Sequence, residues 1–336
     1  MNKITKIGAS ALCGSLAAIS AANAGDLAVT GGVDMSWTSL PMANSGNPIG
    51  IGSNLTFSGS GELDNGWSVK LTVAHTNANV YSNTNVVIGI PGLGDIRVDE
   101  GTTGTGIDRM DDNTPNVWEE AYGTGLGTGI DTVSGVSGGT NIEWTPNTPD
   151  GTTVRVAWSP DVGGKNGNDK STGASEGIKG SGFDITVEAT GEGMGLEGLT
   201  LYGGVSQVEN YQNTTAYNDD NEEVTIGAKF AVGSFTLGYQ WSEEENGRAS
   251  TTTKYQNDGY GITFAINDDL SVGYNLYKSN QSTTTDVEVE ASSIQVAYSV
   301  GGLSVRLADA TVDNALYATA ATNQRDATTL SVALAF

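Results

Sequence analysis

Apolar residues alternate with small or polar residues along most of this chain. In the last nine residues, TTLSVALAF over 328–336, Leu330, Val332 and Leu334 share one side with the terminal Phe336. A period of two places successive side chains on opposite faces of an extended strand. The pattern therefore predicts β-strands that have one apolar face and one polar face.

The same alternation predicts sixteen strands between turns and polar loops. They cover 27–37, 53–63, 67–74, a fourth strand just before the turn at 91–94, 95–99, 139–145, 152–158, 182–190, 199–208, 222–231, 235–242, 254–266, 270–278, 288–300, 303–310 and 326–336. The predicted fold class is therefore all-β.

Long and short connections alternate between these strands, and this order predicts the architecture. Apart from a brief link at 79–84, the odd-numbered connections are long and polar, whereas the even-numbered ones are tight turns such as Asp64-Asn65-Gly66 and Gly301-Gly302. In an antiparallel array this order places all long loops at one end. Transmembrane barrels have this arrangement, with long extracellular loops and short periplasmic turns, whereas a β-sandwich or a solenoid does not.

Aromatic residues near the predicted strand ends agree with a membrane barrel. Trp37, Trp158, Trp241, Tyr81 and Tyr277 stand where amphipathic rings favour the level of the lipid headgroups. The strand faces that carry Leu, Val, Ile and Phe are almost free of charge. The charged faces must then line the lumen, because lipid cannot accept them.

The N-terminus has the features of a secretory signal peptide over 1–24. Lys3 and Lys6 precede a short apolar stretch over 7–19, and an A-x-A cleavage site occupies 22–24. The mature barrel domain is then expected to span 25–336. Cys13, the one cysteine, lies in the leader, so thiol chemistry and disulfides are not expected in the mature chain.

The charge balance narrows the range of functions. The chain has 39 acidic and 15 basic residues and a net charge of −24, which excludes a general nucleic-acid binder. The single histidine, His75, falls on the apolar side of its strand, so no catalytic site and no enzyme activity are expected. No cofactor is expected either. Acidic runs at 219–223 and 243–245 suit weak Ca²⁺ binding, although their spacing matches no defined metal-binding loop.

Taken together, the leader, the sixteen alternating strands, the long third loop and Phe336 resemble the general diffusion porins of Gram-negative outer membranes. The resemblance covers essentially all of 25–336 and rests on pattern and size more than on an exact motif. It implies a homotrimer of water-filled barrels in the outer membrane that passes ions and small hydrophilic solutes passively. It further implies contacts with lipid and lipopolysaccharide, a third loop folded inward as a constriction, and a barrel assembly machinery that reads Phe336.

Candidate pore residues follow from the third loop and from strand alternation. The loop over 101–138 carries Asp131, Arg109 as its lone base, and the acids Asp108, Asp111, Asp112, Glu119 and Glu120. Its stretch 115–122 is expected to form a helical turn with Trp118 and Tyr122 on the barrel wall. The basic residues opposite the apolar faces are Lys70, Arg97, Arg155, Lys229 and Arg306.

An inward-folded loop would set this acidic edge against a basic wall. Such a transverse field aligns polar solutes, and charged linings set ion preference. The resemblance implies this role for Lys70, Arg97 and Arg155, while Lys229 and Arg306 follow from alternation alone. The alternative is that the loop stays outside and the lumen charges are simply solvated.

Two other functions stay open at this point. A substrate-selective channel would need an aromatic ladder or a basic ring along the lumen, and Tyr202 and Tyr277 are the clear candidates for lumen-side aromatics. A secreted acidic adhesin or surface protein built from β-sandwiches would lack the loop segregation and would extract without detergent.

Overall fold

A computed structural model describes residues 27–39, 47–76, 80–101, 104–163, 179–210, 217, 219–249, 254–282 and 287–336. The predicted leader 1–24 lies outside the described residues, as does the side chain of Tyr81. No helix in the described part of the chain is both long and apolar enough to cross a bilayer.

The described chain is built from sixteen β-strands and a few short 3₁₀ turns. The strands are β1 (Leu27–Thr38), β2 (Ile49–Glu62), β3 (Ser68–Thr76), β4 (Val80–Ile90), β5 (Gly94–Asp99), β6 (Asn141–Thr145), β7 (Thr152–Ser159), β8 (Lys179–Thr190), β9 (Leu199–Asn210), β10 (Asn221–Val232), β11 (Phe235–Glu245), β12 (Lys254–Ala265), β13 (Leu270–Gln281), β14 (Val289–Val300), β15 (Leu303–Asp313) and β16 (Arg325–Ala335).

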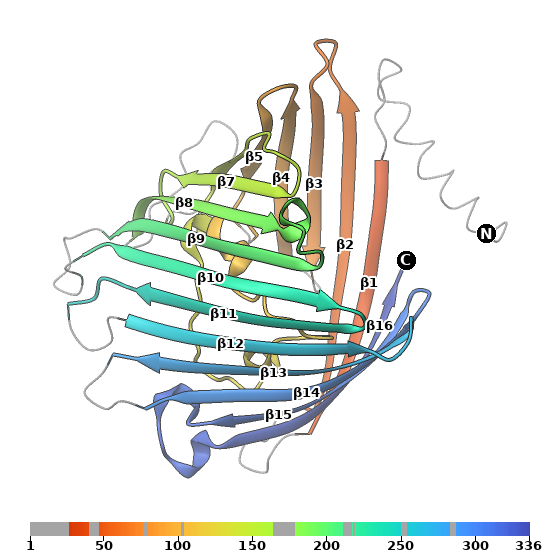
Figure 1. The fold of residues 1–336 in the computed structure, drawn as a ribbon, viewed down its shortest axis with the longest axis vertical. Coiled ribbons are helices and arrows are strands. Elements are labelled where there is room, and N and C mark those ends of the chain that lie inside the picture. The colour runs from red at the N-terminus through yellow and green to blue at the C-terminus, as the bar shows by residue number, and fades with distance from the viewer. Residues whose placement is uncertain are drawn as a thin grey trace.

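The strands pair antiparallel in chain order and close into a barrel (Figure 1). Closure is made by β1 and β16, whose register places Trp37 opposite Leu330. Beyond the last paired residues, Gly31 and Phe336 exchange two backbone hydrogen bonds, of 3.1 and 2.9 Å. A closed sheet leaves no free strand edge, which is a requirement for a β-protein in lipid. The predicted sixteen-stranded barrel is confirmed.

The barrel is apolar on the outside and polar on the inside, as β8 illustrates. Phe183 and Ile185 point outward and are 43% and 40% exposed, whereas Asp184 and Thr186 point inward and are fully buried. The same alternation runs along the neighbouring strands β9 and β10. Exposed apolar side chains on this scale require a lipid surround, because water would not accommodate them.

Several strands run further toward the long-loop end than the apolar pattern predicts. β11 continues to Glu245, β13 to Gln281 and β15 to Asp313, and β2 begins at Ile49 rather than at residue 53. Glu243, for example, stays in the ladder opposite Gln256. Backbone pairing extends beyond the apolar alternation because these strand ends lie outside the lipid, where polar side chains are tolerated on both faces.

The expected aromatic belt is present in part. Trp37 and Trp158 point outward and are 47% and 49% exposed, and Trp241 shares the outward face of β11 with the exposed Tyr239. Tyr277 does not belong to the belt: it is 1% exposed and its hydroxyl lies inside the barrel against Thr114. Tyr277 points inward because the alternation along β13 places it on the inner face, although it is close to the end of the strand. His75 pairs across the sheet with Leu55, on the outer face as expected.

Candidate functional site

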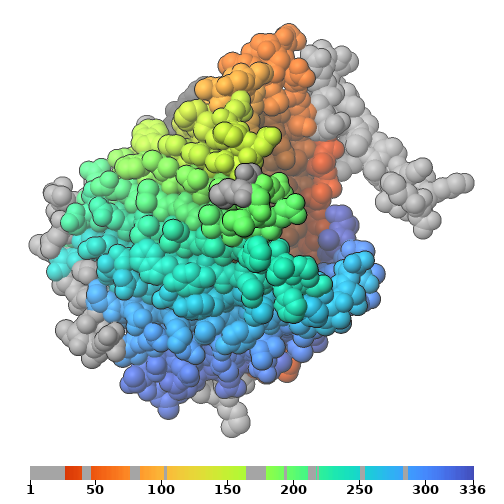
Figure 2. All heavy atoms as spheres, viewed as in Figure 1, coloured from red at the N-terminus to blue at the C-terminus, as the bar shows by residue number. Residues whose placement is uncertain are grey.

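The connection between β5 and β6 lies inside the barrel. It contains three short 3₁₀ turns: η2 (Gly106–Met110), η3 (Ala121–Gly123) and η4 (Gly135–Gly138). In Figure 1 it runs behind β8 to β14, and in Figure 2 the continuous outer wall of these strands hides it from view. We call residues 104–140 the inward segment.

Two carboxylates of the wall hold the inward segment by its backbone. Asp184 on β8 accepts hydrogen bonds from the N–H groups of Ile107 (3.0 Å) and Val136 (3.2 Å) through one oxygen, Oδ2. Glu223 on β10 accepts from Ser134 and Gly135, both at 2.8 Å. Each of these carboxyl groups thus accepts two backbone N–H groups, and together they attach η2 and η4 to the wall.

Amide side chains hold the opposite half of the inward segment in the same way. Gln240 Oε1 accepts from the N–H of Asn113 at 3.0 Å. Gln295 Oε1 accepts from Trp118 at 3.1 Å. These bonds, together with one from Ala121 to Asn275 Oδ1 (2.9 Å), attach the inward segment to β11, β13 and β14.

The predicted helical turn over 115–122 is present only at its end, as η3. Residues 115–120 are irregular, and Gln295 Oε1 accepts from two of their backbone N–H groups, those of Trp118 and Glu119, at 3.1 and 3.3 Å. Tyr122 nevertheless packs on the wall as expected, edge-on to Tyr277 with ring centroids 4.6 Å apart. The Trp118 ring lies 6.0 Å from the guanidinium of Arg306.

Glycines in the wall make room for the inward segment. A Cβ at Gly238 on β11 would lie 2.3 Å from Pro115 Cδ, and one at Gly261 on β12 would lie 2.2 Å from the Pro115 carbonyl oxygen. A Cβ at Gly273 on β13 would lie 3.2 Å from Val117. Residues 115 and 117 of the segment thus lie directly on the backbone of three neighbouring strands.

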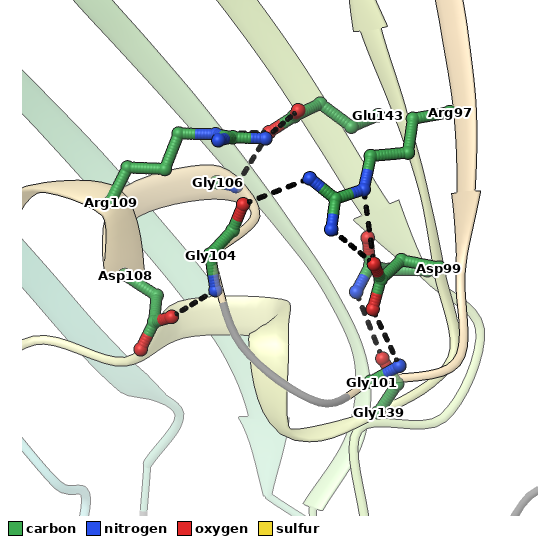
Figure 3. Close-up of polar contacts among 10 residues, drawn as sticks. Arg97, Asp99, Gly101, Gly104, Gly106, Asp108, Arg109, Gly139 and Glu143 are labelled. Carbon is green, nitrogen blue, oxygen red and sulfur yellow. Dashed lines mark hydrogen bonds and ion pairs between the residues drawn. The ribbon is translucent and has the colours of Figure 1, made fainter. Parts of the chain in front are cut away.

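Arginine and carboxylate pairs fix the start of the inward segment (Figure 3). Arg97 forms an ion pair with Asp99 on its own strand and donates to the Gly104 carbonyl at 3.3 Å. Arg109 forms an ion pair with Glu143 at 2.5 Å. Both guanidinium groups therefore belong to local pairs, and Arg97 is not a free cation of the wall.

The five predicted acids of the inward segment form one group. Burial, followed by repulsion from Asp112 and Asp108, raises the pKa of Asp111 to about 8. Burial, a hydrogen bond with Glu119 and repulsion from Asp112 raise the pKa of Glu120 to about 9. Burial also raises the pKa of Asp108. Such mutual effects require the five carboxyl groups to lie near one another, and Asp112 is the exposed one. We call them the acidic cluster.

The five predicted wall cations are inward but differ in their surroundings. Arg306 forms a 3.0 Å ion pair with Asp34 across the β16–β1 closure. Lys229 donates to Asn113 Oδ1 at 3.2 Å and so contacts the inward segment directly. Arg155 is half-buried on β7, and Lys70 is exposed on β3. The structure therefore does not gather them into one basic surface.

The wall also carries acids that the sequence reasoning left out. Cross-strand register links Arg97, Glu143, Ala157 and Asp184 in one row, which continues through Ser206 to Glu223. The wall therefore carries acids as well as the five predicted bases. The missed signal is the alternation itself, since Glu143 stands between Ile142 and Trp144. Alternation places acids inward by the same rule as bases.

Other proposed sites find less support in the described structure. Tyr202 and Tyr277 do point inward, but both are nearly fully buried and bonded to Gln240 and Thr114, so they form no exposed aromatic ladder. Among the described residues, no group of three or more His, Cys, Asp or Glu side chains is placed to hold a metal ion. Asp131, the remaining acid of the inward segment, is exposed.

Comparison with known proteins agrees with this geometry. A family model described as Gram-negative porin matches residues 8–315. The fold is similar to that of Salmonella typhi OmpF in a complex with daunomycin, with a TM-score of 0.68 and 13% identity over 93% of this chain and 98% of that chain. A search of curated protein sequences found no match.

Two further solved structures are similar. An anion-selective porin from Comamonas acidovorans has a TM-score of 0.65 and 14% identity, and OmpT of Vibrio cholerae in a trimer form has a TM-score of 0.66 and 11% identity. In both cases the match covers 93% of this chain and 100% of that chain. At these identities the likeness shows the fold alone.

Proposed function

This chain belongs to the Gram-negative porin family and forms a channel in the outer membrane, and we propose that its inward segment is the constriction that selects solutes. Family and fold point to a channel rather than an enzyme. A closed barrel with a lipid-facing exterior also argues against a secreted β-sandwich adhesin.

The position of the acidic cluster carries this proposal. The inward segment is pinned to wall side chains from β6 to β14, so its carboxyl groups stand in the path through the barrel. Asp112 is exposed on the segment, while Lys70 is exposed on the inward side of β3. Charges of opposite sign on two sides of a narrow water-filled passage orient polar solutes and disfavour apolar ones.

Planar-bilayer recording under a salt gradient tests the role of the cluster. We expect the double variant Asp111→Asn and Asp112→Asn to pass cations less favourably than the wild type. The matched control is Asp268→Asn with Asp269→Asn, which replaces two neighbouring aspartates in a short turn at the far end of the barrel. Equal reversal potentials for the wild type and the cluster variant would contradict the proposed constriction.

We infer further that the protein is a homotrimer. The Vibrio cholerae structure of the same fold is described in a trimer form, and the outer face of β1 and β2 is strongly apolar, with Ile49 and Ile51 67% and 74% exposed. Conductance steps that occur in groups of three, together with a trimer mass in detergent, would support this assembly. Independent single steps and a monomer mass would overturn it.

Phe336 is proposed to be the signal for barrel assembly. Its ring is 79% exposed beyond the end of β16, while its backbone is paired with Gly31. The variant Phe336→Ala should therefore reduce the amount of barrel inserted in the cell and leave the conductance of the inserted barrels unchanged. Normal insertion of Phe336→Ala would show that the residue has no such role.

A further inference from the structure

The tip of the inward segment, residues 125–129, has a glycine at every second position. Gly125, Gly127 and Gly129 occur at alternate positions and all have positive φ, of 83°, 62° and 78°. Glycine is the residue that tolerates this region, and it is also the most flexible one. The conformation of the tip must therefore come from the groups that contact it.

Those groups come from the end of the chain. Arg325, the first residue of β16, donates from Nη1 to the carbonyl oxygens of Leu126 (2.7 Å) and Gly127 (2.6 Å). The backbone N–H of Leu316 donates to the carbonyl oxygen of Thr128 at 2.7 Å. Three successive carbonyl groups of the tip are thus held by the connection between β15 and β16 and by the residue that follows it.

That connection has an unusual backbone at the point of contact. Asn314, Leu316 and Tyr317 have φ values of 57°, 61° and 55°, and they are the non-glycine residues with positive φ in the described part of the chain. The left-handed region is sterically unfavourable for residues other than glycine, and most so for Leu316 and Tyr317, since Asn tolerates it better. Strained backbone persists only when its surroundings hold it in place, and it concentrates at working parts of proteins.

Side chains brace this strained turn. The Asn323 amide donates to the Ala315 carbonyl at 2.5 Å, and Gln324 donates to Asn314 Oδ1 at 3.0 Å. The Tyr317 hydroxyl lies 2.7 Å from Ser279 Oγ on β13. These bonds hold the turn in place without any contribution from the tip.

An apolar cluster joins the turn, the tip and the wall. Leu126 of the tip is buried with Ala315 of the turn and with Val289 and Val312 of the wall, and Tyr317 packs against them. Inward-facing apolar side chains are unexpected in a water-filled barrel. Here they bury the tip of the inward segment against β14 and β15.

We propose that residues 314–324 and Arg325 form a clamp that holds the tip of the inward segment and thereby keeps the channel open. The clamp deepens the proposed function, because it assigns a positioning role at the same constriction. Release of the tip from the clamp would let the glycine-rich stretch move across the passage, and the channel would close.

A disulfide between the clamp and the tip tests this proposal. The predicted mature chain has no cysteine, so the double variant Thr128→Cys and Leu316→Cys adds the sole pair. In single-channel recordings at a fixed high voltage, we expect the oxidised form to close at most one-tenth as often as the same protein after reduction. Equal closing rates in the two forms, with the disulfide verified on a gel, would overturn the clamp.

A second variant tests it without a disulfide. Arg325→Met removes both bonds to the tip, and we expect the closing rate to rise about tenfold, since 1.4 kcal/mol corresponds to a factor of ten. Arg325→Lys keeps the positive charge, so its closing rate should lie closer to that of the wild type than to that of Arg325→Met. The control Lys278→Met removes one cation from the same end of the barrel, where Lys278 pairs with Glu290 at 2.7 Å and not with the tip. A closing rate for Arg325→Met equal to that of the control would overturn the proposal.

Ion selectivity separates the clamp from the constriction. If the acidic cluster is not the filter, its own variants leave the reversal potential unchanged, whatever the clamp variants do. If the clamp is wrong, the closing rates stay equal while the cluster variants still shift the reversal potential.

Discussion

Carboxyl groups inside this barrel have two roles: some attach the inward segment to the wall, and others lie on the inward segment itself. Asp184 and Glu223 accept backbone N–H groups of the inward segment and act as attachment points. Asp111 and Glu120 lie on the segment itself, where burial and neighbouring acids oppose ionisation. Because Asp111 and Glu120 belong to the acidic cluster, a change in their charge would alter which ions pass.

We expect the cation preference of the channel to rise with pH. Asp111 and Glu120 have pKa values raised to about 8 and about 9, so both are protonated and neutral below those values and become negative above them. Reversal potentials measured from pH 6 to pH 10 should move toward greater cation selectivity. The variant Asp111→Asn with Glu120→Gln should give a much flatter profile, and an identical profile would refute the assignment.

Asp112 should matter most at neutral pH, because it is the exposed acid of the cluster. A unit charge acts on an ion at contact with about 1 kcal/mol in water. Asp112→Asn should therefore lower the cation-to-anion permeability ratio by up to about fivefold at pH 7 and low salt. Asp111→Asn alone should change little at pH 6. A large effect of Asp111→Asn at pH 6 would show that Asp111 is already ionised there.

At the residue scale, the sequence predicts which face of the wall a side chain is on, but not always which residue it pairs with. Alternation placed Arg97, Lys229 and Arg306 inward, as the structure has them. It could not show that Arg306 reaches Asp34 from the other end of the chain, because that distance depends on closure. The pair of Arg97 and Asp99, two residues apart on one face of β5, was within reach of alternation. The wall acids Glu143 and Asp184 were within reach of the same rule.

At the scale of elements, contact between the inward segment and the wall depends on small residues. The sequence shows many glycines in strands, but not which of them contact the inward segment. Gly238 and Gly261 do so because their strands face Pro115. The path of the inward segment was equally hidden, since its bonds are made by backbone N–H groups that every sequence has.

We expect Gly238→Ala to displace the inward segment. The new methyl group would lie 2.3 Å from Pro115 Cδ, so the segment must shift, and overpacking of this kind typically costs about 1–3 kcal/mol. Single-channel conductance should change, and the temperature at which the barrel unfolds on a gel should fall. Gly59→Ala is the matched control, because its Cβ would meet nothing within 4 Å. Wild-type behaviour of Gly238→Ala would contradict the close contact.

At the scale of the whole molecule, period-two alternation was sufficient to predict the barrel. It specifies one lipid face and one lumen face. The order of long and short connections between the alternating segments then favours a barrel over a β-sandwich or a solenoid. It failed at strand ends such as Glu245 and Asp313, where the membrane no longer constrains the side chains.

The two faces should respond differently to a new charge. Ile226 points outward from the middle of β10 and is 59% exposed, so Ile226→Arg should cost about 2–4 kcal/mol and reduce insertion. Ser60→Arg is the control on the inner face of β2, where Ser60 pairs with Lys70. We expect the control to insert normally in a heat-modifiability assay. Equal insertion of both variants would mean that Ile226 does not face lipid.

The wall holds the inward segment to a large extent by the segment's backbone N–H groups, which donate to Asp184, Glu223 and Gln295. Backbone N–H groups stay in place whatever side chain they carry. Side chains of the segment that point into the passage can therefore be exchanged without moving the segment. The backbone of the segment thus sets its position, and its side chains set the selectivity. Evolution or protein engineering can therefore change which solutes pass without changing the architecture of the pore.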